Sequence, residues 1–516
     1  MRSVFKLEFL FLLLAMPFLS FSQESKKILL KMADVLAYNK PENPDVQYLK
    51  GSVVFQHENS FMYCDSALLY INKNKMEAFG NVHVRVSDTT QIYGNKLLFD
   101  GNSKIAIMEE KVELIDNNIV LHTEKLYYDI GNAMGYYLDS AEIQDPNNKL
   151  TSKHGYYFSD KKEFFFRHNV VVTGNNFKLT SDSLMYNTNT ELISFYGNTH
   201  IINDETNIYC NQGWYNTKTD KSELIGRAKM TNRSSVLIGD TLRYNRAVGI
   251  GNARRNAVFK DTTENVILYS HYADLKMSDS SVMATDSAVF IKWEQSDSLF
   301  LHGDTLYTRK DSASSREVKV YNHVRFFRPD MQGVCDSLYY SESDSLMRFY
   351  VDPCLWSDST QISADYIDLK VDKNKPQKLF LKNKAFIISL YENFEYQQIK
   401  GDSIHGYFVD NILDNLLVEN NAEVIYFIED ENGAKTGINK TKSTRMRIFL
   451  KDGEVSSIDM LAKPKGTIFP NKDLPQSERK LEGFEWRESE RPLSKNDIFR
   501  RKSKSTNTGT VVRGVE

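Results

Sequence analysis

The sequence predicts an all-β protein built from a tandem repeat. The chain of 516 residues contains 28 Tyr and 30 Phe but only 11 Pro, and aromatic side chains favour strands over helices. Apolar and polar residues alternate over short stretches, which is the pattern of a strand with one buried face. A segment of the type Asp-Ser-Leu recurs roughly every 29 to 33 residues, which is typical of a repeat fold.

Charge and composition narrow the class of protein. The chain has 65 Lys and Arg against 68 Asp and Glu, a net charge of -3, and no long basic run that could neutralise phosphates. We therefore expect no nucleic-acid partner. With 41% hydrophobic and 26% charged residues, the composition is that of a soluble protein.

The first residues have the order of an export signal. Basic residues precede the apolar run 9–18, and the small-x-small pattern Ser20-Phe21-Ser22 ends just before Gln23, as signal peptidase requires. The apolar run is short for a membrane span. We predict that residues 1–22 are a signal peptide and that the mature chain is periplasmic, with an uncleaved anchor as the alternative.

Two polar corners define each repeat. The first is the Asp corner, at the recurring Asp-Ser-Leu segment. The second, the Gly-Asn corner, follows it by roughly 16 to 20 residues, as in Gly80-Asn81-Val82. Residues 23–465 form one continuous array of about twelve or thirteen repeats, either undivided or in two or three stacked modules; residues 466–516 follow it. The first corner, the Asp corner, is placed at Asp65, Asn95, Glu124, Lys153, Asp182, Asn211, Asp240, His271, Asp304, Asp336, Ala364 and Asp402.

The apolar positions around the corners predict how a repeat folds. Leu237 stands three residues before Asp240 and Leu242 stands two after it, so the two leucines cannot share one face of a straight strand. A bend or bulge must lie between them. Each repeat is therefore predicted to be a long hairpin bent at both corners, and stacked repeats form two facing sheets around an apolar interior.

The corner Gly80-Asn81-Val82-His83-Val84 and the strands of type Asp-Ser/Thr-Leu-x-Tyr resemble the OstA-type β-jellyroll of the LptA family of lipopolysaccharide-transport proteins. The many repeats are similar to the long OstA-like proteins of Bacteroidota. The resemblance implies an elongated, non-enzymatic bridge without a cofactor, which carries lipid to the outer membrane and takes part in outer-membrane assembly. It implies lipopolysaccharide or a lipid A-type glycolipid as ligand. Its implied partners are other lipopolysaccharide-transport components at the inner and outer membranes, joined by β-edge addition.

The interior positions supply the candidate lipid-lining residues. Their burial must first hold the two sheets together. If the interior is filled, the chain is a structural or adhesive β-solenoid of the cell envelope without lipid cargo, whereas splayed sheets leave a groove for acyl chains. The candidates are Met62, Ile92, Leu121, Leu150, Leu179, Ile208, Leu237, Leu268, Val84, Leu114, Val172, Ile201 and Phe259.

No residue pattern indicates catalysis or a metal centre. The corner aspartates could be catalytic carboxylates or calcium ligands, but side chains of this type cap bends, and a catalytic pair would not recur in most repeats. The Asp-Ser/Thr corners also resemble an O-glycan acceptor motif of Bacteroidota periplasmic proteins, a reading that stays open. The histidines lack metal-ligand spacing. We expect no catalytic, cofactor-binding or metal residue.

The cysteines and the C-terminal region complete the predictions. Cys64, Cys210 and Cys335 occupy the same position of distant repeats and lie too far apart to form disulfides with one another. Cys335 and Cys354 share a repeat, and a disulfide between them stays open if the two corners face each other. Residues 466–516 lose the repeat and are predicted to form a flexible basic tail, with contact to an anionic headgroup or a partner as the alternative.

The repeat number also predicts a length. Twelve or thirteen repeats of two strands, spaced about 4.8 Å apart, give a rod of roughly 110 to 120 Å. Small-angle scattering on the mature monomer tests this expectation, and the radius of an ordinary compact globule would contradict it.

Overall fold

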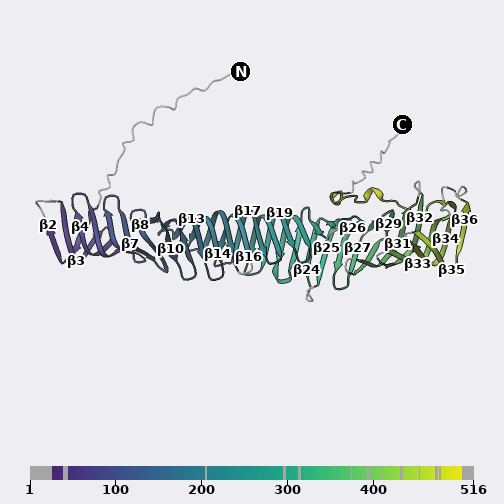
Figure 1. Ribbon diagram of the computed structural model, residues 1–516, viewed down its shortest axis with the longest axis horizontal. Helices are drawn as coiled ribbons and strands as arrows, with labels where there is room; N and C mark the ends of the chain where they lie inside the picture. Colours follow the sequence, from purple (N-terminus) through teal and green to yellow (C-terminus); the bar gives the residue numbers. More distant parts are fainter. Residues whose placement is uncertain are drawn as a thin grey trace, which may run out of the picture. The chain divides into compact units, whose positions relative to one another are not determined.

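The structure is a computed structural model that describes the chain from residue 26 to residue 501 (Figure 1). The predicted signal peptide, residues 1–22, lies outside the described residues. The chain divides into two compact units, unit 1 with residues 1–189 and unit 2 with residues 190–516. Within residues 26–501 the description omits residues 39–44, 204–205, 294–297, 312–314, 373–374, 392–394, 411, 431–433, 452–453, 471–474 and 476–477.

Unit 1 consists of antiparallel strands. Most contain about eleven residues, and buried and accessible side chains alternate along them. The strands are β1 (Leu29–Met32), β2 (Val35–Tyr38), β3 (Val46–His57), β4 (Ser60–Tyr70), β5 (Lys75–Arg85), β6 (Thr90–Asp100), β7 (Ile105–Asp116), β8 (Ile119–Asp129), β9 (Met134–Tyr137), β10 (Ala141–Gln144), β11 (Lys149–Ser152), β12 (His154–Phe158), β13 (Glu163–Thr173) and β14 (Lys178–Asn187).

Unit 2 continues the same architecture with longer strands toward its end. The described residues contain no α-helix, only short 3-10 turns, so the prediction of an all-β repeat fold is confirmed. The elements are β15 (Leu192–Ile202), β16 (Thr206–Asn216), β17 (Lys221–Asn232), β18 (Ser235–Asn245), β19 (Ile250–Asp261), β20 (Val266–Lys276), η1 (Met277–Asp279), β21 (Ser281–Thr285), β22 (Val289–Lys292), β23 (Leu299–His302), β24 (Thr305–Lys310), β25 (Arg316–Arg328), β26 (Met331–Ser341), β27 (Leu346–Tyr350), β28 (Cys354–Ser357), β29 (Thr360–Ser363), β30 (Tyr366–Asp372), β31 (Lys375–Leu390), β32 (Tyr396–Val409), β33 (Ile412–Glu429), β34 (Lys435–Lys451), β35 (Glu454–Ala462), β36 (Lys465–Pro470), η3 (Glu488–Glu490) and η4 (Asp497–Phe499).

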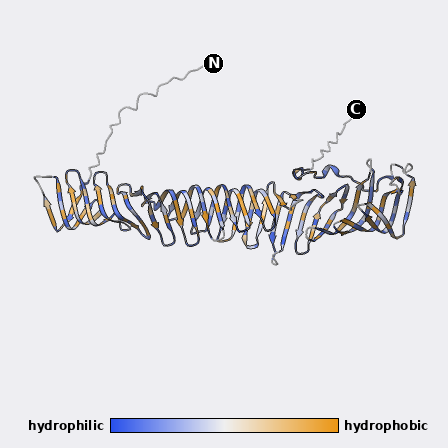
Figure 2. Ribbon diagram, viewed as in Figure 1, coloured by the Kyte–Doolittle hydropathy of each residue, from blue (hydrophilic) through white to orange (hydrophobic). Residues whose placement is uncertain are grey.

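The long strands are bent by β-bulges at the corners, as the parity of the sequence predicts. The pairing of β5 with β6 shifts between Phe79 and Val82. There Gly80 and Asn81 have φ angles of 71° and 42°, the left-handed region that Gly and Asn adopt at low cost. Each bend turns the strand so that its two halves lie in different layers, and hydrophobic and hydrophilic residues alternate along both halves (Figure 2).

The two kinds of corner are hydrogen-bonded to each other on neighbouring strands. Asn81 Nδ2 donates to Asp65 Oδ2 over 2.8 Å, and Asn256 Nδ2 donates to Asp240 Oδ2 over 2.9 Å. The geometry supports the cap role of the corner aspartates, because each carboxylate satisfies a side chain of the adjacent bend. The same arrangement recurs in the pairs His323–Asp304, Lys384–Asp365 and Asn421–Asp402.

One predicted corner is displaced by a residue. The backbone N–H of Asp365 donates to Asn383 O over 3.0 Å, as that of Asp304 donates to Asn322 O over 3.0 Å. Ala364, which the sequence assigned to this corner, is instead 7% exposed and packs in the apolar interior. The assignment to Ala364 was wrong by one position because it relied on spacing, which does not report which side chain caps the bend.

All four cysteines are free. Cys354 directly opposes Val334 in the pairing of β26 with β28, so the next residue, Cys335, points to the other face of the sheet. Cys335 packs in the interior, whereas Cys354 packs beside Trp356 on the outer face. The pairing of Cys335 with Cys354, which the sequence left open, does not form because the sheet separates the two thiols.

Candidate functional site

In unit 1 the predicted lining positions form one row of directly opposed side chains. Met62 opposes Val84, and Val84 in turn opposes Ile92. Every member of the row is at most 6% exposed, so these residues are core. They are Met62, Val84, Ile92, Leu114, Leu121, Leu150, Val172 and Leu179, with Ile143 between Leu121 and Leu150.

The facing layer of unit 1 fills the remaining space. Large rings alternate with small residues along the row Phe99, Ala106, Tyr128, Gly135 and Tyr157. A Cβ added at Gly135 would lie 3.2 Å from the Tyr128 ring, so the ring occupies the place of a side chain. The alternation of large and small residues packs the layers closely, and the interior of unit 1 is filled by its own side chains at these positions.

Polar contacts also join turns at opposite ends of the strands of unit 1, and these two rows of turns are called its rims. Glu58, in the turn after β3, pairs with Lys104, in the turn after β6, over 2.9 Å. Asp116, at the end of β7, pairs with Lys162 over 2.6 Å and is 1% exposed. In both pairs the partners are 46 residues apart, so the contact follows the repeat. The hydrogen bond to Lys104 lowers the pKa of the Glu58 carboxyl, although desolvation acts in the opposite direction.

Asp116 is the most enclosed of these rim groups. Thr90 Oγ1 donates to its carboxylate over 3.1 Å, and the hydroxyl of Tyr157 donates to the same oxygen. Burial, together with this carboxylate, raises the pKa of Tyr157, which keeps its hydroxyl protonated as a donor. A buried charge with this many partners is stabilised in place. These contacts therefore hold the two rims together at Asp116.

The same interior positions are accessible in unit 2. Ile201, Ile208, Leu237 and Phe259 are each half-buried, whereas Leu268 is 3% exposed. They belong to a single row in which Met230 lies between Ile208 and Leu237. One column of the repeat is therefore sealed core in unit 1 and only partly buried in unit 2.

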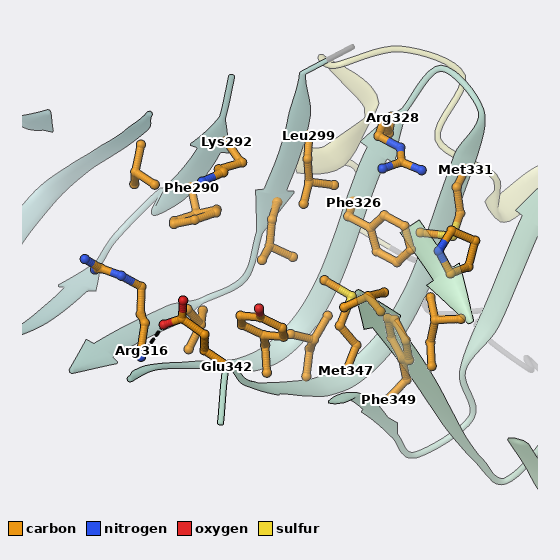
Figure 3. Close-up of a pocket in the computed structure, with 18 of the residues that line it drawn as sticks. Phe290, Lys292, Leu299, Arg316, Phe326, Arg328, Met331, Glu342, Met347 and Phe349 are labelled. Atoms are coloured by element: carbon orange, nitrogen blue, oxygen red, sulfur yellow. Dashed lines mark hydrogen bonds between the residues drawn. The ribbon is translucent and has the colours of Figure 1, made fainter. Parts of the chain in front are cut away.

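The row leads into an apolar pocket of about 190 Å³ within unit 2 (Figure 3). One wall continues the row through Phe290, Leu301 and Phe326. The opposite wall presents Tyr340 and Met347, which are cross-strand neighbours. Figure 3 shows Phe290 and Phe326 on one side of the space and Met347 on the other. The sequence did not single out these pocket residues, although Phe290 and Leu301 continue columns that it had recognised.

Charged side chains surround the pocket mouth. Lys292 Nζ donates to Glu264 O over 2.6 Å, and Arg328 is held by Asp330 over 2.6 Å. The Arg316 backbone N–H donates to Glu342 over 2.8 Å (Figure 3). Its guanidinium has no hydrogen bond or ion pair to another described residue, so this cation is available to an anionic ligand.

Neither a metal centre nor a membrane-spanning helix is found in the described residues. They contain no group of three or more His, Cys, Asp or Glu side chains that could hold a metal ion. In the same part of the chain, no helix is long and apolar enough to cross a membrane.

The C-terminal region differs from its prediction. Residues 465–470 form β36 and pair with β34, and the described residues 478–501 pack against the strands of unit 2. Leu481 is 3% exposed and Ile498 is 1% exposed, so the expectation of a flexible tail is wrong for this segment. One signal in the sequence could have indicated it: residues 385–388 are all apolar instead of alternating. A strand of this kind is buried on both faces, as residues 385–388 are, and needs a cover on each face.

The bent antiparallel strands and the apolar interior define a β-jellyroll repeat protein. The family model described as OstA-like protein matches residues 25–182 and 175–255, and over these residues the chain is similar to OstA-like proteins. The match ends before the first residue of the pocket, Glu264.

Comparison with solved structures and curated proteins adds two findings. Among the solved structures that match is LptH, the LptA homologous periplasmic component of the conserved lipopolysaccharide transport device from Pseudomonas aeruginosa. It is 15% identical, with 26% of this chain and 94% of that chain covered at a TM-score of 0.20. The comparison with curated proteins found no match.

Proposed function

We propose that this chain is a non-enzymatic periplasmic protein of lipopolysaccharide transport. In unit 2 the pocket and the partly buried row from Ile201 to Phe259 that leads to it, together called the groove, hold the acyl chains of lipopolysaccharide or a lipid A-type glycolipid. The observation that supports lipid binding is the change in burial of one interior column. Its side chains are buried in unit 1 and only partly buried from Ile201 to Phe259 in unit 2. The OstA-like match supports the transport role. In this role the chain serves outer-membrane assembly.

The pocket supplies the physical basis for lipid binding. Phe290, Phe326 and Met347 present apolar surface on facing walls, and each CH₂ group of an acyl chain buried there gains about 0.8 kcal/mol. The guanidinium of Arg316 at the mouth has no bond to another described residue and suits a phosphate group, to which arginine donates two parallel hydrogen bonds. An acyl chain with an anionic headgroup therefore fits both the interior and the rim.

Unit 1 has a different role in this proposal. Its filled interior favours the structural alternative for that part of the chain, as a scaffold without lipid cargo. Its first strands expose apolar side chains, with Leu29 54% and Val35 55% exposed. In unit 2, Ile468 of the last strand, β36, is 64% exposed. Edge strands of this kind accept further strands, and we propose that transport partners at the two membranes join there.

Site-specific photo-crosslinking in cells tests the proposed ligand. A photoreactive residue at Leu237 or Phe290 is expected to capture lipopolysaccharide. Leu121 is the matched control in the filled interior, and Arg243, exposed on the same strand as Leu237, is the outward control. Capture from Arg243 as strong as from Leu237, or no capture from either groove position, would contradict the proposal.

A further inference from the structure

The wall that forms the pocket has a second apolar face. On the outer side of the sheet, Val334, Cys354 and Trp356 form one buried cluster. A second cluster contains Phe386, Ile388, Ile425, Ile438 and Leu481. Leu481 belongs to the C-terminal strap, residues 478–501, which Figure 1 shows in yellow beside β26 and β29. The strap covers an outer face that would otherwise expose these side chains to water.

A row of buried glutamines runs along this outer face. Gln332, Gln361 and Gln398 are 3%, 0% and 0% exposed, and each stands four residues before an Asp corner. In the strand pairing Trp356 lies between the first two glutamines, and Ile388 lies between the last two. Every second strand therefore presents one buried amide, at intervals of about 9.6 Å.

Two of these glutamines bind the backbone of the strap in the same way. Gln398 Nε2 donates to Arg479 O over 2.8 Å, and its Oε1 accepts the N–H of Leu481 over 2.8 Å. Gln361 Nε2 donates to Glu485 O over 2.7 Å, and its Oε1 accepts the N–H of Arg487 over 2.6 Å. Each amide thus binds the carbonyl of one strap residue and the N–H of the residue two positions later. These contacts recognise the backbone of the strap and do not depend on the identity of its side chains.

Turns bring the strap from one glutamine to the next. The N–H of Phe484 donates to Leu481 O over 3.1 Å, at a turn that contains Gly483 with a φ of 86°. A second turn closes between Glu490 N–H and Arg487 O over 2.9 Å. The strap then reaches Gln332, whose Oε1 accepts from Arg491 Nε over 2.8 Å.

Side chains of the strap add specific contacts. Arg487 is 5% exposed and pairs with Asp352 over 2.8 Å and with Glu490 over 2.9 Å. Leu481 fills the apolar cluster. The determinants of the strap are therefore two backbone clamps, an apolar residue at the first clamp and an arginine at the second.

The far end of the strap contacts β23. The rings of Phe499 and His302 lie 4.8 Å apart, and His302 Nδ1 lies 2.8 Å from Ala288 O. Burial lowers the pKa of His302, while its contact with Ala288 and the charge of Asp304 act against this and Arg501 and Arg325 reinforce it. Arg501 also pairs with Asp304 over 3.0 Å.

We propose that the outer face of β26 to β34 is a peptide-binding groove, and that the strap is its built-in and exchangeable ligand. The groove takes a peptide of the strap's chemistry, with an apolar residue at the Gln398 clamp and an arginine six residues later at the Gln361 clamp. The strap is held only by noncovalent contacts, so it opens in local unfolding. An opened groove exposes Trp356, Phe386 and Ile388, and apolar surface of this kind binds another chain.

Peptide exchange on the full mature chain tests this proposal. The probe is a fluorescent synthetic peptide of residues 478–501, and binding is followed by anisotropy. Arg487→Ala weakens the resident strap and leaves the groove intact, so we expect it to bind the peptide about tenfold more tightly than the unmodified chain, because the open fraction rises. Leu481→Ala is a second strap variant and should act in the same direction.

Groove variants decide between exchange and nonspecific binding. Adding Gln361→Leu to Arg487→Ala removes one backbone clamp and should lower peptide binding about tenfold or more, since two hydrogen bonds are lost. Gln91→Leu is the matched control, because Gln91 stands four residues before the Asn95 corner and bonds to His83 instead of the strap. No peptide binding by either strap variant, or equal binding with and without Gln361, would overturn the proposal.

Discussion

Leu121 and Leu237 occupy the same position of different repeats, and replacing each by alanine tests whether the interior is closed in one unit and open in the other. Leu121 is 1% exposed, so Leu121→Ala leaves a cavity and should cost about 3 to 5 kcal/mol of local unfolding free energy. Leu237 is half-buried, so its replacement by alanine removes only part of the transfer free energy of a leucine side chain and leaves no sealed cavity. Leu237→Ala should therefore cost about 1 kcal/mol.

Native-state hydrogen exchange measures both costs locally, which suits a repeat protein whose stability is not a single quantity. Protection of β7 and β10, the neighbours of β8, should fall more than about 100-fold in Leu121→Ala. Protection of β17 and β19 should fall about fivefold in Leu237→Ala. Equal losses in the two variants would refute the distinction between a filled interior and an open groove.

Three further predictions follow from the described contacts. Asp116→Asn removes the charge that holds Lys162, so the free energy of local opening at the β12–β13 turn should fall by roughly 3 kcal/mol and amide hydrogen exchange there should speed up accordingly. An unchanged exchange rate would show that the contact between Asp116 and Lys162 contributes nothing. His302 has a lowered folded-state pKa, so the Phe499 end of the strap should be held fully above about pH 6.5 and loosen as the pH falls below it. Trypsin cleavage near Phe499 should rise on acidification, and His302→Phe should abolish that dependence. Mass spectrometry after export should find four free thiols, and alkylation at pH 8 should require denaturation, because burial raises the pKa of Cys64 to about 12 and of Cys210 to about 11.

The sequence by itself determined the repeat, the bent strands and the interior columns. These features are local, because the parity between Leu237 and Leu242 forces a bulge whatever surrounds it. The pairing of Asn81 with Asp65 likewise follows from two recurring segments at a fixed separation. Where spacing alone was used, as at Ala364, the assignment was displaced by one residue.

The tertiary structure alone decided whether a given interior position is core or groove. Leu121 and Leu237 look the same in the sequence, and their burial depends on the side chains of the opposite layer and on the rims. In unit 1 Tyr128 covers Gly135 and Lys162 reaches Asp116, and these particular side chains, rather than the column itself, seal the interior. The strap shows the same limit more strongly, since Gln361 binds the N–H of Arg487 across 126 residues of chain. Alternation predicts which way a side chain points, whereas its burial is set by whatever the fold brings to face it.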